Sequence, residues 1–136
     1  MKEAKHLING SWVASEDNDT LDVLSPSDGL VFAKIARGKA GDVDLAVKAA
    51  QTALDSGAWG KFAAVDRGRL LSKLGTKILD NFDELANLEA LDTGKPLKQA
   101  KADITAAGRY FEYYGGAADK VHGDTIPFMD GYMVSI

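Results

Sequence analysis

The chain has 136 residues, of which 46% are hydrophobic and 26% are charged, and its formal net charge is −4. This balance is typical of one globular domain, and an acidic chain has no electrostatic attraction to nucleic acid or to an anionic membrane. The sequence contains no cysteine, which excludes disulfides, thiolate metal sites and a cysteine nucleophile within these residues. No apolar run reaches the ~18 residues of a membrane-spanning helix, and the N-terminus lacks a signal-peptide core, so we expect a cytoplasmic protein.

The sequence of the N-terminal quarter of the chain favours β-strands. Residues 7–13 are apolar around Asn9-Gly10, a pair that favours a tight hairpin, although the short flanking runs also fit one kinked strand. Residues 21–24 and 30–36 are strand candidates, and residues 25–29 between them have the composition of a turn. We therefore expect a small antiparallel sheet.

About four helices should follow this sheet, because apolar residues recur at helical spacing in four stretches. Asp42 is the expected N-cap of the first helix, and the second covers about residues 65–81. Asp83 is the expected cap of a third, short helix, which Gly94 ends by its freedom to adopt a left-handed conformation.

The fourth helix should be the longest. Pro96 suits its first turn, and its apolar stripe continues to about Val121. Two adjacent glycines, Gly115 and Gly116, are expected to bend or fray it.

The last residues predict a strand. Residues 132–136 alternate in polarity, and neither a turn nor a polar tail follows Ile136. Because a strand that stops this way leaves an unprotected sheet edge, we expect the chain to be a piece of a longer protein.

The most informative segment is residues 84–97, ELANLEALDTGKPL, which encodes a helix, a sharp stop and a new helix start. Its sequence resembles that of the aldehyde dehydrogenase superfamily, in which a Leu-Glu-x-Leu-Asp-x-Gly-Lys-Pro segment recurs near the N-terminus. Further matches occur in order along nearly the whole chain, at residues 8–12 (INGSW), 25–29 (SPSDG), 42–50 (DVDLAVKAA), 59–71 (Trp59 with RGRLL), 113–120 (YYGGAADK) and 123–127 (GDTIP).

This resemblance implies an α/β, aldehyde dehydrogenase-like fold, of which the chain supplies the N-terminal part. Residues 1–122 would be the start of the NAD(P)-binding domain, whose helices surround a Rossmann-like core. Residues 123–136 would begin the oligomerisation arm, so that a homo-oligomer, either a dimer or a tetramer, forms through a strand of five residues: Tyr132, Met133, Val134, Ser135 and Ile136.

The resemblance also implies an oxidoreductase that converts an aldehyde to a carboxylic acid with NAD or NADP. In the family a Cys nucleophile, an oxyanion hole and a Glu base perform this chemistry, and their motifs lie beyond Ile136. We therefore assign no catalytic and no cofactor-binding residue to this chain, and expect it to be inactive alone, with no cofactor bound. The alternative is a non-catalytic helical interaction module derived from the same scaffold.

One metal site is implied by the same resemblance. Many family members hold a structural monovalent cation with a carboxylate, here Asp92, and with backbone carbonyls, here those of Val23 and Leu24. Hard oxygen ligands suit such an ion. The alternative is that Asp92 simply accepts hydrogen bonds from backbone N–H groups near a helix end.

Other polar or aromatic groups predict structure rather than chemistry. Gly94-Lys95-Pro96 lacks the spacing and the hydroxyl of a phosphate loop. His6 and His122 lack metal-ligand spacing and are expected at the surface or at hinges. An aromatic cluster is expected to pack in the core or in an interface, and comprises Tyr110, Phe111, Tyr113 and Tyr114.

Overall fold

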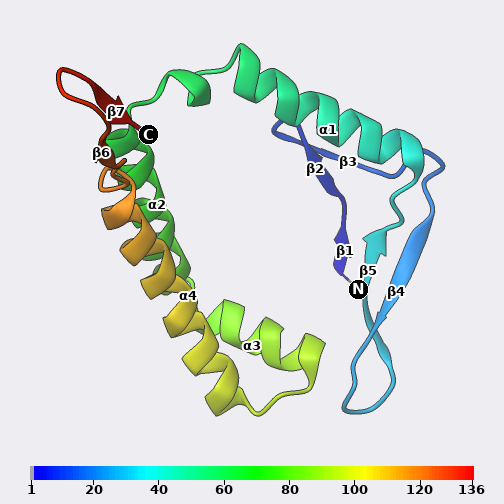
Figure 1. The fold of residues 1–136 in the computed structure, drawn as a ribbon. Helices are drawn as coiled ribbons and strands as arrows, with labels where there is room; N and C mark the ends of the chain where they lie inside the picture. The colour runs from blue at the N-terminus through cyan, green and yellow to red at the C-terminus, as the bar shows by residue number, and fades with distance from the viewer. Residues whose placement is uncertain (1) are drawn as a thin grey trace.

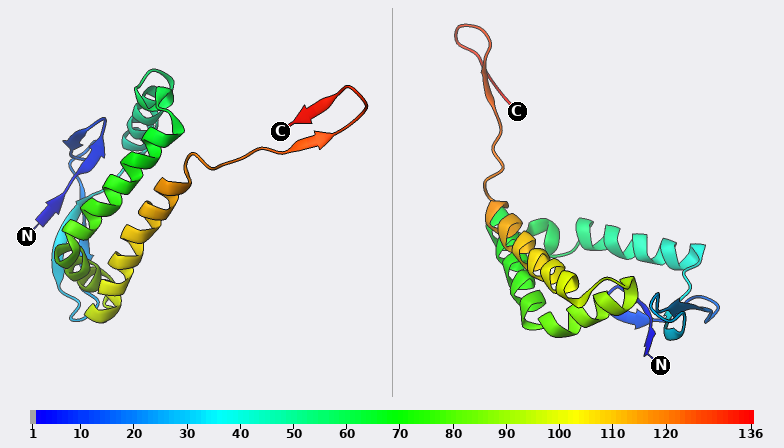
Figure 2. Two further views of the ribbon diagram at one scale, coloured as in Figure 1. Left: turned by 90° about the vertical axis from the view of Figure 1, so that its left-hand side faces the viewer. Right: turned by 90° about the horizontal axis from the view of Figure 1, so that it is seen from below.

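The computed structural model describes residues 2–136, which form an open ring of helices and small sheets with a hairpin projecting from it (Figures 1 and 2). The helices are α1 (Ala40–Asp55), α2 (Ala64–Asp80), α3 (Phe82–Thr93) and α4 (Leu97–Ala117), with a short 3₁₀ turn at Trp59–Lys61. The strands are β1 (Lys2–Ala4), β2 (His6–Ile8), β3 (Ser11–Val13), β4 (Thr20–Leu24), β5 (Val31–Ala36), β6 (Thr125–Pro127) and β7 (Met133–Ser135).

The N-terminal strands form two sheets rather than one antiparallel sheet. β4 and β5 pair antiparallel across the predicted turn, but β1 lies parallel to β5, with Glu3 opposite Lys34. The prediction of a small antiparallel sheet therefore holds for β4 and β5, but it did not include the parallel strand β1. This pairing joins residues more than thirty positions apart, and the sequence pattern of three residues carries no signal for it.

The Asn9-Gly10 pair does make a hairpin. β2 and β3 pair antiparallel with Ile8 opposite Ser11, which leaves a two-residue loop. Asn9 and Gly10 both have positive φ, at 51° and 75°, as the twist-compatible hairpin turn requires. The kinked-strand alternative is excluded.

Two predicted helix caps were wrong. Asp42 lies at the third position of α1, not at its N-cap, because the helix already begins at Ala40. Its carboxylate accepts a hydrogen bond from the N–H of Lys39, at 2.9 Å. Asp42 therefore still satisfies a backbone donor at the start of the helix. α3 likewise begins at Phe82, one residue before Asp83, and Asn81 precedes it.

The closest helix packing is between α2 and α4, which lie antiparallel side by side (Figures 1 and 2). Each helix contributes two glycines seven residues apart. A Cβ on Gly68 would lie 2.3 Å from the carbonyl oxygen of Gly115, and a Cβ on Gly75 would lie 2.7 Å from that of Gly108. Only glycine permits this approach of the two backbones.

The end of α4 corrects one further prediction. The helix stops at Ala117 and not at Val121, and residues 118–124 lead away from it to the β6–β7 hairpin. Gly115 lies within the helix and is buried against α2. The predicted C-terminal strand is confirmed as β7, which pairs antiparallel with β6 and extends away from the helices (Figure 2).

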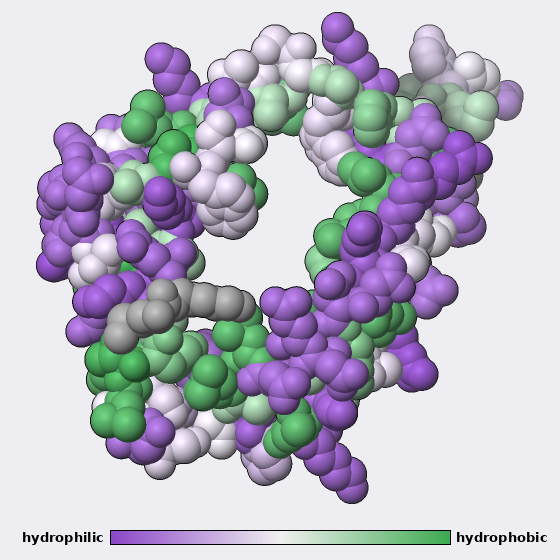
Figure 3. Space-filling model, turned by 180° about the vertical axis from the view of Figure 1, so that it is seen from behind, coloured by the Kyte–Doolittle hydropathy of each residue, from purple (hydrophilic) through white to green (hydrophobic). Residues whose placement is uncertain are grey.

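The ring contains little hydrophobic core. Among residues 2–136 the fully buried apolar residues are Ala86 and Ala100, whereas many large apolar side chains stay exposed, including Leu45, Val47 and Tyr113. Figure 3 shows an opening through the middle of the molecule, with hydrophobic side chains along parts of its rim. None of the helices described is long and apolar enough to cross a lipid bilayer.

Candidate functional site

The candidate cation site lies where the end of α3 meets the turn that follows β4. Gly94 ends α3 with φ of 72°, and its N–H donates to the carbonyl of Ala90 at 3.0 Å. A Cβ on Gly94 would lie 2.8 Å from Cγ of Pro26, so the two segments are in direct contact. This contact brings the last turn of α3, which carries Asp92, toward the end of β4, which carries Val23 and Leu24.

Both segments can supply oxygen atoms. The pairing of β4 with β5 shifts register between Val23 and Leu24, which interrupts the regular ladder at the two carbonyls in question. Asp92 is exposed, and its carboxylate has no hydrogen-bond or ion-pair partner in the part of the chain that the structure describes. The alternative prediction, that Asp92 binds backbone N–H groups, therefore finds no support in these contacts.

Lys95 fixes the corner between α3 and α4 next to this site. Its ammonium donates to Glu89 of α3 and to Asp103 of α4, the latter at 2.8 Å. Asp103 and Glu89, through these hydrogen bonds, raise the pKa of Lys95 above its usual value. Lys95 therefore has a structural role, since it links α3 to α4. This agrees with the sequence analysis, in which residues 94–96 did not match a phosphate-binding loop.

A groove of about 720 Å³ runs along α4, on a face that neither α2 nor α3 covers. Tyr110, Tyr113 and Tyr114 border it and are 64%, 70% and 60% exposed, so they do not pack in the core of the described chain, and their packing in an interface stays a prediction. The reason is that α4 meets α2 through its small residues, which leaves the tyrosine face without a partner. The rest of the lining is Ala102, Thr105, Ala106 and Arg109.

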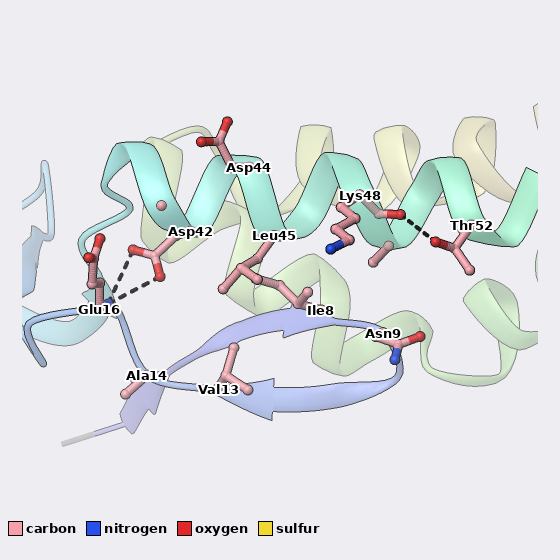
Figure 4. A pocket seen from close by; sticks show the side chains of 12 residues that line it. Ile8, Asn9, Val13, Ala14, Glu16, Asp42, Asp44, Leu45, Lys48 and Thr52 are labelled. Carbon is pink, nitrogen blue, oxygen red and sulfur yellow. Dashed lines mark hydrogen bonds between the residues drawn. The ribbon is translucent and has the colours of Figure 1, made fainter.

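A second hollow, of about 800 Å³, separates α1 from the β2–β3 hairpin (Figure 4). Ile8 and Leu45 lie on its opposite walls, and Lys48 points into it from α1. No local pattern predicts this hollow, because it depends on the position of the hairpin relative to a helix that begins some thirty residues later.

Asp42 joins the start of α1 to the segment that follows β3, beside this hollow. Asp42 is only 6% exposed, and its carboxylate accepts hydrogen bonds from the N–H groups of Lys39 and Glu16, the latter at 3.1 Å. Nε2 of His6 lies 3.9 Å from it, is buried, and has no hydrogen-bond partner among the described residues. His6 is thus half-buried, whereas His122 is exposed in the segment after α4, as predicted for a surface or hinge residue.

The side chains described above have structural roles. Among residues 2–136 no three His, Cys, Asp or Glu side chains are grouped to hold a metal ion. What the elements define instead is a mixed α/β shell with two open apolar hollows and one corner at which the end of α3 contacts the turn after β4.

The comparisons with known proteins identify this shell. Residues 12–136 match the model of the aldehyde dehydrogenase family, and the chain belongs to that family. It is 45% identical over 129 residues to aldehyde dehydrogenase family 2 member B4, mitochondrial, of Arabidopsis thaliana, covering 94% of this chain and 24% of that protein.

Solved structures agree with this assignment. The NAD-dependent aldehyde dehydrogenase of Sinorhizobium meliloti superimposes with a TM-score of 0.90 at 32% identity, covering 98% of this chain and 27% of that one. PnpE of Pseudomonas, solved in complex with nicotinamide adenine dinucleotide, gives a TM-score of 0.88 at 41% identity, covering 96% and 26%. The chain therefore spans about a quarter of the length of these relatives, and the predicted resemblance and α/β fold are confirmed.

Proposed function

We propose that this chain is the scaffold part of an enzyme that oxidises an aldehyde to a carboxylic acid with NAD or NADP. The reaction consumes the aldehyde, water and the oxidised cofactor, and yields the acid, the reduced cofactor and a proton. The observation that carries the proposal is the family match over residues 12–136, together with a backbone that superimposes on an NAD-dependent relative. Because the chain has no cysteine, the thiol nucleophile of this chemistry has to come from residues outside it.

The alternative, a self-sufficient interaction module, has less support. A module of this kind needs a hydrophobic core of its own, and the described residues bury only Ala86 and Ala100 completely. The open ring fits a part that is completed by further polypeptide. In this proposal residues 1–122 belong to the cofactor-binding domain, and residues 123–136 belong to an arm that joins subunits into a homo-oligomer. The projecting β6–β7 hairpin supports that division.

The test of the activity compares two proteins. Residues 1–136 alone, mixed with an aldehyde and with NAD or NADP, are expected to give no increase in absorbance of the reduced nicotinamide. A chain that continues to the full length of its relatives is expected to give turnover and to sediment as an oligomer. Turnover by residues 1–136 alone would contradict the scaffold role, and an inactive, correctly folded full-length protein would contradict the enzyme.

We also propose that Asp92 and the carbonyls of Val23 and Leu24 hold a structural monovalent cation. The free carboxylate, the irregular pairing of β4 and the Gly94–Pro26 contact support this site. Hard oxygen donors of this kind bind Na⁺ or K⁺, and the ion would stabilise the α3–α4 corner without entering the reaction.

The cation site predicts a salt-specific stability. Adding NaCl or KCl is expected to raise the melting temperature of the full-length protein more than choline chloride at equal ionic strength, because a bound ion stabilises only the folded state. Asp92→Asn should remove that difference, and Asp80→Asn, at an exposed carboxylate in the last turn of α2, should preserve it. Equal effects of all three salts on the unchanged protein would rule the site out.

A further inference from the structure

We propose that Asn9 is a site of spontaneous deamidation, in which its side-chain amide becomes a carboxylate through a cyclic imide formed with Gly10. The proposal rests on four properties of the β2–β3 hairpin: the residue that follows Asn9, the exposure of the loop, the free amide groups of both residues, and the shortness of the strands that hold the loop. It is independent of the proposed enzymatic activity.

The reaction needs only water. The backbone nitrogen of Gly10, after losing its proton to hydroxide, attacks Cγ of Asn9. A bond forms between that nitrogen and Cγ, the bond between Cγ and Nδ2 breaks, and ammonia leaves. Water then opens the five-membered imide at either carbonyl, which gives aspartate or isoaspartate. The net change is one amide and one water converted to one carboxylic acid and one ammonia, with no oxidation or reduction.

Gly10 removes the steric barrier to this attack. A side chain on the following residue would crowd the nitrogen as it approaches Cγ, and glycine has none. The surroundings are also open, since a Cβ placed on Gly10 would meet nothing within 4 Å. Both residues of the loop are exposed, and Asn9 lies at the tip of the hairpin (Figure 4).

The other asparagines of the chain lack these conditions. Asn18 shares the exposed, left-handed backbone, with φ of 58°, but is followed by Asp19. Asn81 and Asn87 are followed by Phe82 and Leu88, and their side-chain amides donate to backbone carbonyls at 2.8 and 2.7 Å. Only Asn9 combines a following glycine with a side chain that makes no hydrogen bond among the described residues.

The hairpin can open far enough for the attack. The N–H of Gly10 makes none of the described hydrogen bonds, so the nucleophile is available. The strands share only the pairs His6–Val13, Leu7–Trp12 and Ile8–Ser11, and a two-stranded hairpin of this size is marginally stable in water. Local opening of such a segment costs little compared with unfolding of the chain.

The two products should affect the hairpin differently. Aspartate tolerates the positive φ of position 9 nearly as well as asparagine does, so that product keeps the turn. Isoaspartate adds a carbon to the main chain of a two-residue loop, and the pairing of Ile8 with Ser11 should then be lost. Either product adds a negative charge at the rim of a hollow that already holds Glu16, Asp42 and Asp44.

The experiment follows the amide in the folded chain. The protein is incubated at neutral and at mildly alkaline pH, digested with trypsin and sequenced by mass spectrometry. Cleavage after Lys5 and Lys34 puts Asn9 and Asn18 in one peptide, so each molecule carries its own control. We expect the mass gain of an acid at residue 9, faster at the higher pH, with isoaspartate detected by a methyltransferase assay and with residue 18 unchanged.

Two variants complete the design. Gly10→Ala should lose most of the conversion, and its circular dichroism shows whether the strained turn still folds. Asn9→Gln, whose imide would need a six-membered ring, should also lose it. Conversion of Asn18 at the rate of Asn9 would overturn the proposal. So would an unconverted Asn9 in the folded chain under conditions in which the urea-unfolded chain converts.

Discussion

The Gly115→Ala variant is expected to be less stable than the Gly116→Ala variant, by a difference of about 1–3 kcal/mol in the free energy of unfolding. A Cβ on Gly115 would lie 2.7 Å from the carbonyl oxygen of Gly68 and 3.0 Å from the backbone nitrogen of Ser72. Because these are backbone atoms, α2 has to move away from α4 to accept a single methyl group. Urea unfolding followed by circular dichroism measures the difference.

Gly116 is the matched control for this prediction. It lies in the same turn of α4, but a Cβ there would meet nothing within 4 Å. Both variants gain the helix preference of alanine over glycine, about 1 kcal/mol, so this gain cancels in the comparison. Gly116→Ala should therefore be more stable than the unchanged protein. Equal stabilisation by both substitutions would show that α2 and α4 are not in contact at Gly115.

Replacing Asp42 by alanine is expected to lower the free energy of unfolding by about 1–3 kcal/mol, because two backbone N–H groups then lose the buried carboxylate that accepts from them. The carboxylate accepts from Lys39 at the start of α1 and from Glu16 before β4, so the substitution separates two elements distant in sequence. Hydrogen exchange should show the loss first at the N–H groups of Lys39 and Glu16. Thermal unfolding of the full chain gives the magnitude.

Asp44→Ala is the control for Asp42→Ala. Asp44 belongs to the same first turns of α1, but it is exposed and makes no hydrogen bond or ion pair with another described residue. Its removal should change the stability by no more than ~0.5 kcal/mol. If both variants lost the same stability, the effect would come from the charge near the helix start and not from the buried hydrogen bonds.

Local patterns predicted most of the elements correctly. Apolar periodicity located all four helices, Asn9-Gly10 predicted a two-residue hairpin, and Gly94 ends α3 in the left-handed conformation assigned to it. These features depend on interactions within a few residues, so the local sequence was sufficient to predict them. The predicted helix ends were less accurate: α1 begins two residues before Asp42, and α4 ends at Ala117 and not at Val121. Helix ends depend on contacts with other segments as well as on local propensity.

Long-range contacts account for what the sequence did not reveal. The pairing of β1 with β5, the hollow beneath α1 and the exposure of the tyrosines all depend on which faces meet in space. Gly115 is the clearest case. As a pattern, two adjacent glycines suggest a weak point in a helix, and only the presence of α2 turns one of them into a packing site. The candidate ligands Asp92, Val23 and Leu24 came from family resemblance, because no local pattern joins them.

The paired glycines also restrict how the ring can deform. Gly68 meets Gly115 and Gly75 meets Gly108, so the two helices touch at points seven residues apart on each. Sliding α4 by one helical turn, about 5.4 Å, would press side chains against both narrow points at once. The glycine contacts therefore hold α2 and α4 in one register along their common axis. A change in the shape of the molecule therefore has to occur outside this helix pair, for example at Gly94 or in residues 118–124.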